Sequence, residues 1–363
     1  MLNPMPSRTI SKSAFSLLEL LVSLAVLAVI LLLVANVVSF LLSLSSSSKS
    51  RVSIEQGTRE SAGYLTRKLG RATLNSYFDY IDSAGTFRTP ANANSFSPDD
   101  YRLSSDLHFI AAPASDVLNA SASLFPGSAV LFQSGSGVSS TPLEGLSESL
   151  NASGFFIEFS QRTDRPSFLN GILPPEPFRY RLVEVVEPTE SFSVFASTKP
   201  ASGSGGYDRT WIDNLLGMRR TIIADNVVFL LVLPKLSPAL EKELSGKSDG
   251  SYLAPTYLYD SRSWEKSSPD GSRADLTQNT LPPSLEVVLV SISEASARRI
   301  DNGSTPPLDG LFAGLFTDSA LLHKTQNDEG DMARMETRLR DRDLDYRIAR
   351  FEIPLSAARW MVP

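Results

Sequence analysis

A long apolar run near the N-terminus constrains this chain more than any other feature. Residues 15–44 form a 30-residue segment with a single charged side chain, Glu19. As an α-helix this segment would be about 45 Å long, whereas the hydrocarbon core of a bilayer is about 30 Å thick. No second run of comparable length and purity follows it. The sequence therefore predicts one membrane span followed by a much larger water-exposed body.

Basic residues flank the run on both sides. Arg8, Lys12 and the amino terminus precede it, and Lys49 and Arg51 follow it. The first helix of a membrane protein usually sets the orientation through the basic residues that precede it. We therefore expect a single-pass membrane protein with a cytoplasmic N-terminus and a body that faces the periplasm or the exterior.

Two ordinary explanations of the run compete with a specialised one. A secretory signal peptide has an apolar region of about 7–15 residues and a small-x-small cleavage site. This run is longer, and no such site closes it cleanly. A plain membrane anchor fits the length but not Glu19, because a carboxylate at mid-bilayer costs about 2.5–3.5 kcal/mol. Length and charge alone leave the plain anchor open.

The segment KSAFSLLELLV, which starts at Lys12, resembles the prepilin signature of type IV pilins and pseudopilins. In that family a basic leader ends in a small residue, and cleavage exposes a Phe that is then N-methylated. The fifth mature residue is Glu, and a long apolar helix follows. The resemblance implies cleavage between Ala14 and Phe15 by a prepilin peptidase, methylation of Phe15, and a role in assembly for Glu19. Arg8 and Lys12 are then the basic residues of the leader, and Ala14 stands where Gly is usual.

The motif is physically coherent. In a filament the mature helices would bundle in a shared apolar core, where an isolated ammonium or carboxylate costs several kcal/mol. If the Glu19 carboxylate pairs with the amine of Phe15 in a neighbouring subunit, both penalties are relieved. The same pair would set the axial register between subunits.

The chain divides into four predicted parts: a leader over 1–14, a membrane or filament-core helix over 15–44, an amphipathic continuation over 45–75, and a head over 76–363. Within 45–75, apolar or small residues recur at steps of three and four and would form one stripe along an amphipathic helix. The alternative is a separate surface helix after a linker. Polar or glycine-rich loops are predicted near 197–210 and 247–279. The stripe consists of Ile54, Thr58, Ser61, Leu65, Leu69 and Ala72.

Strand patterns dominate after residue 100. Candidate strands cover 106–112, 129–133, 155–159, 178–186, 221–233, 285–292 and 348–355. These segments are rich in Val, Ile, Phe and Tyr and are bounded by Pro, Gly, Ser and Asn. No strand–helix–strand rhythm repeats, which argues against a doubly wound parallel sheet. We predict an α+β chain, with the long N-terminal hydrophobic helix packed on a mainly antiparallel, pilin-like head.

Two later segments are similar to those of particular pseudopilins. TIIADNVVF from Thr221, followed by LPPSLEVVLV from Leu281, is an order found in minor pseudopilins of the J type in type II secretion. Pseudopilin-like proteins of the Verru_Chthon cassette type, protein C in particular, have the same order. A strand that begins after Pro is sensible, since Pro has no N–H to donate.

Composition and motif spacing exclude several classes of function. The net charge is −6, with no Cys and only two His, His108 and His323, so a cysteine-ligated metal is excluded and a nucleic-acid partner is not expected. The glycines near 135–137 and 203–206 do not have the spacing of a phosphate-binding loop. Neither His lies in a nucleophile motif. The acidic clusters at 99–100 and 328–331 lack an EF-hand pattern. We therefore expect no catalytic residue, cofactor or metal.

The segment 331–350 carries six Arg, with Glu336 and Arg340 spaced to form a helical ion pair. A solvated helix is the favoured interpretation, and a charged docking surface is the alternative.

These features predict a non-catalytic, minor pseudopilin-like subunit of a type II secretion or type IV pilus-like assembly. Its expected partners are prepilin peptidase, other pseudopilins or pilins, and the inner membrane. The alternative is a membrane-anchored periplasmic or surface protein that binds or adheres while displayed on such a filament. An anchored hydrolase ranks third.

Overall fold

The computed structural model describes residues 17–89, 91–140, 148–162, 166, 168, 172, 174–196, 209–262, 278–324 and 330–359. The chain divides into a unit that ends at Val52 and a head that begins at Ser53. The leader, Ala14 and Phe15 lie outside the described residues. So do residues 197–208 of the loop predicted near 197–210 and residues 263–277 of the loop predicted near 247–279.

Helix α1 covers Leu17–Leu69, a length of 53 residues. Its first half is rich in Leu, Val and Ala and contains no proline, so no residue there removes a backbone hydrogen bond. The serine run at 45–48 lies inside the helix rather than in a linker. Within the head, α1 ends at Leu69 just before Gly70.

A six-stranded antiparallel sheet forms one layer of the head, and its strands are ordered β7-β6-β5-β4-β3-β9. The long central strands are paired over most of their length. Because neighbours in sequence are mostly neighbours in space, the sheet is largely a meander. The strands are β3 (Ile110–Pro113), β4 (Ser128–Gly135), β5 (Leu150–Gln161), β6 (Phe178–Glu187), β7 (Arg220–Asp225) and β9 (Tyr259–Asp260).

A second sheet has three antiparallel strands in the order β11-β10-β8. A separate ribbon pairs β1 (Tyr77–Ile81) with β2 (Asp100–Ser104). The predicted α+β class with antiparallel sheets is thus confirmed. The second sheet consists of β8 (Val227–Lys235), β10 (Ser284–Ile292) and β11 (Tyr346–Pro354).

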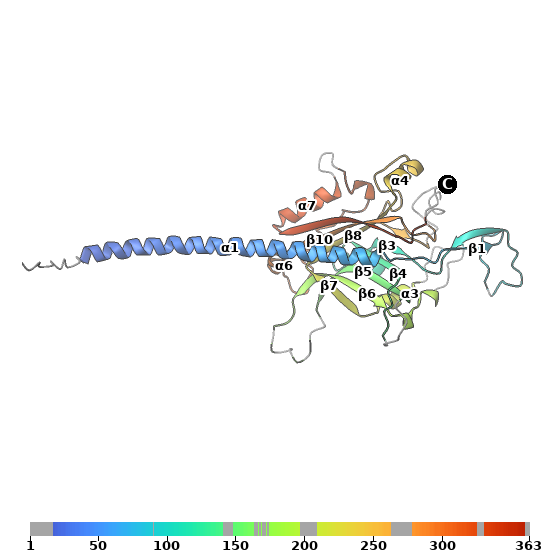
Figure 1. Cartoon of the computed structure of the whole chain (residues 1–363), viewed down its shortest axis with the longest axis horizontal. Coiled ribbons are helices and arrows are strands. Elements are labelled where there is room, and N and C mark those ends of the chain that lie inside the picture. The colour runs from blue at the N-terminus through green and yellow to red at the C-terminus, as the bar shows by residue number, and fades with distance from the viewer. Residues whose placement is uncertain are drawn as a thin grey trace, which may run out of the picture. The chain divides into compact units, whose positions relative to one another are not determined.

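Short helices cover the sheets. Figure 1 shows α7 and α4 on one side of the three-stranded sheet and α3 against the six-stranded sheet. Two buried clusters follow from this layering. One joins α1, both sheets and α7, and the other lies between the six-stranded sheet, α2 and α3. The helices are α2 (Ala114–Leu118), α3 (Thr210–Leu216), α4 (Pro238–Ser245), α6 (Glu294–Arg299) and α7 (Asp331–Asp341), with short 3₁₀ turns η2 (Thr189–Ser191), η3 (Val194–Ala196) and η4 (Ser319–Leu321).

The prediction of a single strand over 221–233 is wrong, because this segment forms two strands that belong to different sheets. Asn226 separates β7 from β8 and has a left-handed backbone, with φ of 60°. Asn tolerates that conformation better than most residues, because its side chain can bond locally. The corner at Asn226 therefore passes the chain from the six-stranded sheet to the three-stranded sheet.

Other predicted boundaries need smaller corrections. The strand expected at 106–112 begins only at Ile110, and the β1–β2 ribbon was not predicted. The loop expected at 247–279 contains β9 and a buried stretch that includes Tyr257 and Tyr259. Long-range pairing decides these segments, and their local sequence does not carry that information.

The two sheets meet where the backbones of Gly127 and Leu230 form an isolated parallel bridge. Gly127 has φ of +85°, and a Cβ placed there would lie 2.1 Å from the carbonyl oxygen of Leu230. Only glycine satisfies both the backbone conformation and this close approach. The junction of the sheets therefore requires a glycine at position 127.

We expect Gly127→Ala to destabilise the head strongly. Gly246 is the matched control, because it has φ of +72° but open space around its Cβ. Gly246→Ala should lower the free energy of unfolding by about 1–2 kcal/mol for the left-handed backbone alone. Gly127→Ala should lower it by at least about 2 kcal/mol more, because of the overlap. Urea unfolding of the full chain in a non-ionic detergent measures both, and equal losses would contradict the account.

Candidate assembly segment and head anchors

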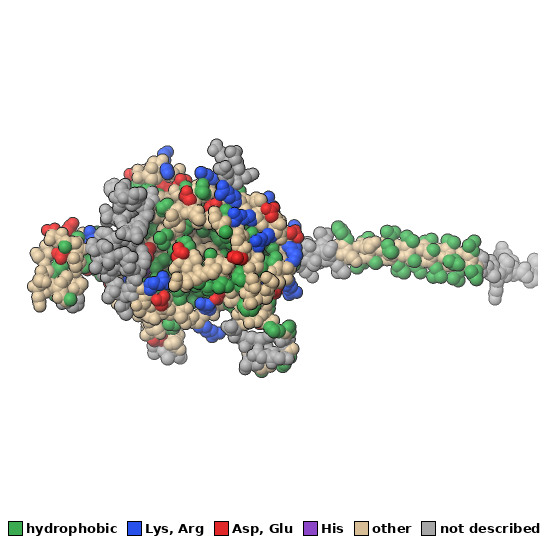
Figure 2. Space-filling model, turned by 180° about the vertical axis from the view of Figure 1, so that it is seen from behind, with side chains coloured by type: hydrophobic (Ala, Val, Ile, Leu, Met, Phe, Trp, Pro, Cys, Tyr) green, Lys and Arg blue, Asp and Glu red, His purple; other side chains and the backbone are tan. Residues whose placement is uncertain are grey.

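The apolar part of α1 is the segment that the sequence predicts to take part in filament assembly. Leu17–Leu41 has a mean hydropathy of 3.0, and none of it is buried. Figure 2 shows hydrophobic side chains along this length, whereas charged side chains are spread over the head. It is the one helix, among the residues with assigned positions, that is long and apolar enough for a single membrane span or a signal sequence.

The predicted site residues are only partly covered by the structure. Glu19 lies in the first turn of α1 and is exposed. A carboxylate there interacts favourably with the N-terminal end of the helix dipole. Arg8, Lys12, Ala14 and Phe15 lie outside the described residues.

Within the head, the second part of α1 is held by its buried stripe. Thr58, Ser61, Leu65 and Leu69 are at most 3% exposed, while Ile54 is half-buried. These positions recur every three or four residues, so they share one face of the helix. Hydrophobic burial on this face anchors the helix to the sheets.

A buried carboxylate on β6 adds a directional anchor for the same face. The Tyr64 hydroxyl donates to Oε2 of Glu184 at 2.6 Å, and Nζ of Lys68 lies 3.3 Å from Oε1. Burial and the neighbouring carboxylate raise the pKa of Tyr64, so its hydroxyl stays protonated and donates. At the other sheet, Arg347 of β11 pairs with Glu55 at 3.0 Å. Hydrogen bonds and ion pairs thus set the rotation of the helix in the head.

His108 belongs to a fully buried hydrogen-bonded network. The Trp211 Nε1–H donates to Nδ1 of His108 at 3.0 Å, and His108 Nε2 lies 2.7 Å from Oδ1 of Asp260. Because Nδ1 accepts, the proton of the neutral ring is on Nε2 and is donated to Asp260. Burial lowers the pKa of His108 despite the opposing effect of Asp260. Both ring nitrogens are occupied, which suits a core residue that holds α3 against the sheet.

Glu286 of β10 gathers three basic side chains. Its Oε1 lies 2.7 Å from His323 Nε2 and 2.5 Å from Arg350 Nε, and its Oε2 lies 3.2 Å from Lys235 Nζ. Burial would raise the pKa of Glu286, but hydrogen bonds from His323 and Arg350 and the nearby positive charges lower it to about 2. His323 lies in the turn that follows η4.

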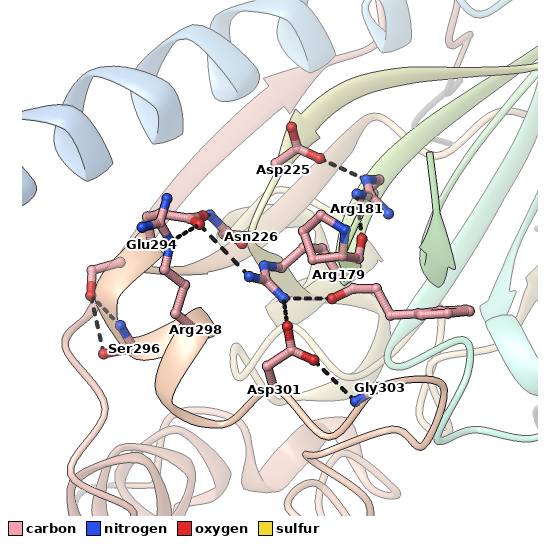
Figure 3. A network of polar contacts seen from close by, with 12 residues as sticks. Arg179, Arg181, Asp225, Asn226, Glu294, Ser296, Arg298, Asp301 and Gly303 are labelled. Carbon is pink, nitrogen blue, oxygen red and sulfur yellow. Dashed lines mark hydrogen bonds and ion pairs between the residues drawn. The ribbon is translucent and has the colours of Figure 1, made fainter. Parts of the chain in front are cut away.

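A third polar cluster joins β6 to β7 and to the segment that follows β10 (Figure 3). Arg181 of β6 donates from Nε to Asp225 at 2.7 Å, and Arg179 donates to Asp301 at the same distance. Both guanidiniums are nearly buried, and Arg179 also lies 3.7 Å from Glu294 of α6. Cations and carboxylates are interleaved, so their charges largely offset one another while they hold β6 to β7 and to the segment around α6.

The remaining residues that the sequence suggested for metal binding or modification have structural roles. Asp331 is buried and accepts a hydrogen bond from the backbone of Phe316 at 2.8 Å. Asn151, which is followed by Ala152 and Ser153 as in a glycosylation motif, has a buried amide bonded to backbone carbonyls. Across the described ranges, no three His, Cys, Asp or Glu side chains gather so that they could hold a metal ion.

The arginines of α7 have a role that charge patterning missed. The predicted Glu336–Arg340 pair forms at 3.0 Å, but Arg338 and Arg342 instead donate to backbone carbonyls of residues 307–313. The segment is therefore not simply a solvated helix. No sequence period signals this contact, because the acceptors are backbone oxygens of a distant loop.

No family model matches the chain, and neither the curated proteins nor the solved structures contain a match to it.

The Glu286 cluster predicts an acid-sensitive head. The unfolded carboxyl has a pKa of about 4.3, so it binds a proton before the folded one does. The contribution of Glu286 to the free energy of unfolding is full above about pH 5 and is lost as the pH falls towards 2. We expect Glu286→Gln to flatten this pH dependence in urea unfolding. Glu336→Gln, at an exposed pair on α7, is the control and should leave the profile unchanged; parallel profiles for all three proteins would contradict the assignment.

Proposed function

We propose that the chain is a non-catalytic, minor pseudopilin or pilin-like subunit. It is cleaved after Ala14, methylated on Phe15 and built into a periplasmic pseudopilus or a related filament. The machine is of the type II secretion or type IV pilus class. The helix Leu17–Leu41 serves first as the membrane anchor and then as the filament core.

One observation carries the proposal: a single carboxylate, Glu19, opens an apolar helix that is exposed on every side. An anchor alone gives no reason to keep a charge there. Pairing with the methylated amine of Phe15 on a neighbouring subunit gives one, because it removes two buried unpaired charges at once. The same apolar surface then packs on the helices of other subunits.

The head supports a structural role. His108 is enclosed by Trp211 and Asp260, and His323 is committed to Glu286. Both imidazoles thus contact side chains of the head, which supports a structural role for them. We place the head in the periplasm with the N-terminus cytoplasmic. Its bulk favours a tip or low-copy position, since a large head is hard to repeat along a tight helical array.

A second function, binding to an external ligand while displayed on a filament, is favoured by the β1–β2 ribbon. Phe78, Tyr80 and Tyr101 are exposed by 64%, 46% and 59%. The strand register places them on one face, and the rings of Tyr80 and Tyr101 lie 4.7 Å apart. Exposed aromatic surface of this kind is typical of interaction sites.

The first test is the mature N-terminus in the native host. We expect mass spectrometry of the purified chain to find a species that begins at N-methyl-Phe15. Deletion of the prepilin peptidase should leave the leader attached, which serves as the control. An intact Met1, or a cut beyond residue 35, would remove the proposal.

The second test concerns Glu19. We expect Glu19→Val to reduce cross-linking to other filament subunits by at least tenfold, because the partner ammonium is left buried and unpaired at a penalty of several kcal/mol. Glu60→Gln is the control, since Glu60 is an exposed carboxylate on the head part of the same helix. It should assemble normally. If Glu19→Val assembles normally, the proposed pairing is wrong, and the observations support only a membrane-anchored globular protein.

A further inference from the structure

A cavity of about 430 Å³ lies in the head beside the junction of the two sheets. Its volume is within the range of about 300–1,000 Å³ that is usual for small-ligand sites. One wall is formed by Gly127 and β8, and another by the turns of residues 308–317. It is thus a feature of the head and lies apart from the proposed assembly segment.

Aromatic rings form much of the lining. The ring centroid of Phe229 lies 4.4 Å from that of Phe312 and 4.8 Å from that of Phe316. Tyr257 packs on Phe316 edge to face at 6.2 Å, and Tyr180 completes the set. Such faces carry negative electrostatic potential, which attracts cations.

The loop wall is held in place from α7. Arg338 donates to two loop carbonyl oxygens at 2.8 and 2.9 Å, and Arg342 donates to another at 2.9 Å. Asp331 accepts a hydrogen bond from the backbone N–H of Phe316 at 2.8 Å. These bonds explain how Phe316 keeps its left-handed backbone, with φ of 58°. The cavity is therefore preformed, and a ligand need not order its wall.

The charge of the lining has one sign. Among the described residues that line the cavity, the charged ones are Asp116 and Asp309, and both are exposed at its rim. Arg342 lies close by, but its guanidinium is bound to the backbone carbonyls of Pro307 and Asp309 and does not line the cavity.

We propose that this cavity binds a small organic cation, an ammonium group that carries alkyl substituents. Its positive charge would face Asp116 and Asp309, and its alkyl groups would pack on Phe229, Phe312 and Phe316. An anion would meet two carboxylates, and a neutral apolar ligand would leave them unused. Aromatic rings combined with carboxylates are the general solution for binding alkylated ammonium groups.

Binding of choline to the full chain in a non-ionic detergent is the direct test, measured by isothermal titration calorimetry against empty micelles. The matched probe is 3,3-dimethylbutan-1-ol, which has the shape of choline without its charge. We expect choline to bind about tenfold more tightly than this alcohol. Equal affinity for the two probes, or no binding of choline at millimolar concentration, would overturn the proposal.

Variants assign the binding to this cavity. Asp309→Asn should weaken choline binding about fivefold and leave the neutral alcohol unaffected, and Phe312→Leu should weaken both probes. Asp213→Asn is the control, because Asp213 is exposed on α3 and does not line the cavity. Thermal unfolding checks that each variant is folded. Choline binding that survives both cavity substitutions in folded protein would refute the site.

The ammonium group could belong to a free metabolite or to a side chain of a neighbouring protein. Nα-acetyl-lysine methylamide and its trimethylated form separate these sources. Preference for choline over both amides supports a free ligand, and equal or tighter binding of an amide supports a lysine side chain of a partner.

Discussion

The head depends on the burial of one face of the last turns of α1. Leu65 and Leu69 enter a core that both sheets share, and Tyr64 and Lys68 converge on the buried Glu184 of β6. Apolar burial supplies most of the stabilisation, but it is not directional. The hydrogen bond and ion pair at Glu184 add the rotational setting. The last turns of α1 are thus fixed within the head by contacts of both kinds.

Charge in this head is used mainly to join elements. Arg181 pairs with Asp225 across β6 and β7, and Arg179 ties β6 to Asp301 after α6. Arg338 and Arg342 hold a distant loop by its carbonyl oxygens. The cavity beside Gly127 differs, because the charged residues that line it, among those described, are both carboxylic acids.

Sequence reasoning recovered the parts that depend on local pattern. The helical stripe with Leu65 and Leu69 and most of the strands follow from apolar periodicity, which a chain carries in every fold it adopts. The same reasoning merged β7 with β8, because Asn226 is one polar residue in a long apolar run. It also missed the β1–β2 ribbon, whose strands are separated by many residues and are stabilised only by pairing.

The sequence by itself determined that a nearly uncharged helix would begin near Glu19, that the head would be an antiparallel α+β body, and that neither histidine sits in a catalytic motif. Hydrophobicity, residue spacing and the absence of a motif are properties of the linear chain. Only the tertiary structure decided that Glu184 meets Tyr64, that His108 is sealed by Trp211, and that aromatic rings and two carboxylates surround one cavity. Those contacts join residues far apart in the chain, and no local period records which distant side chains will meet.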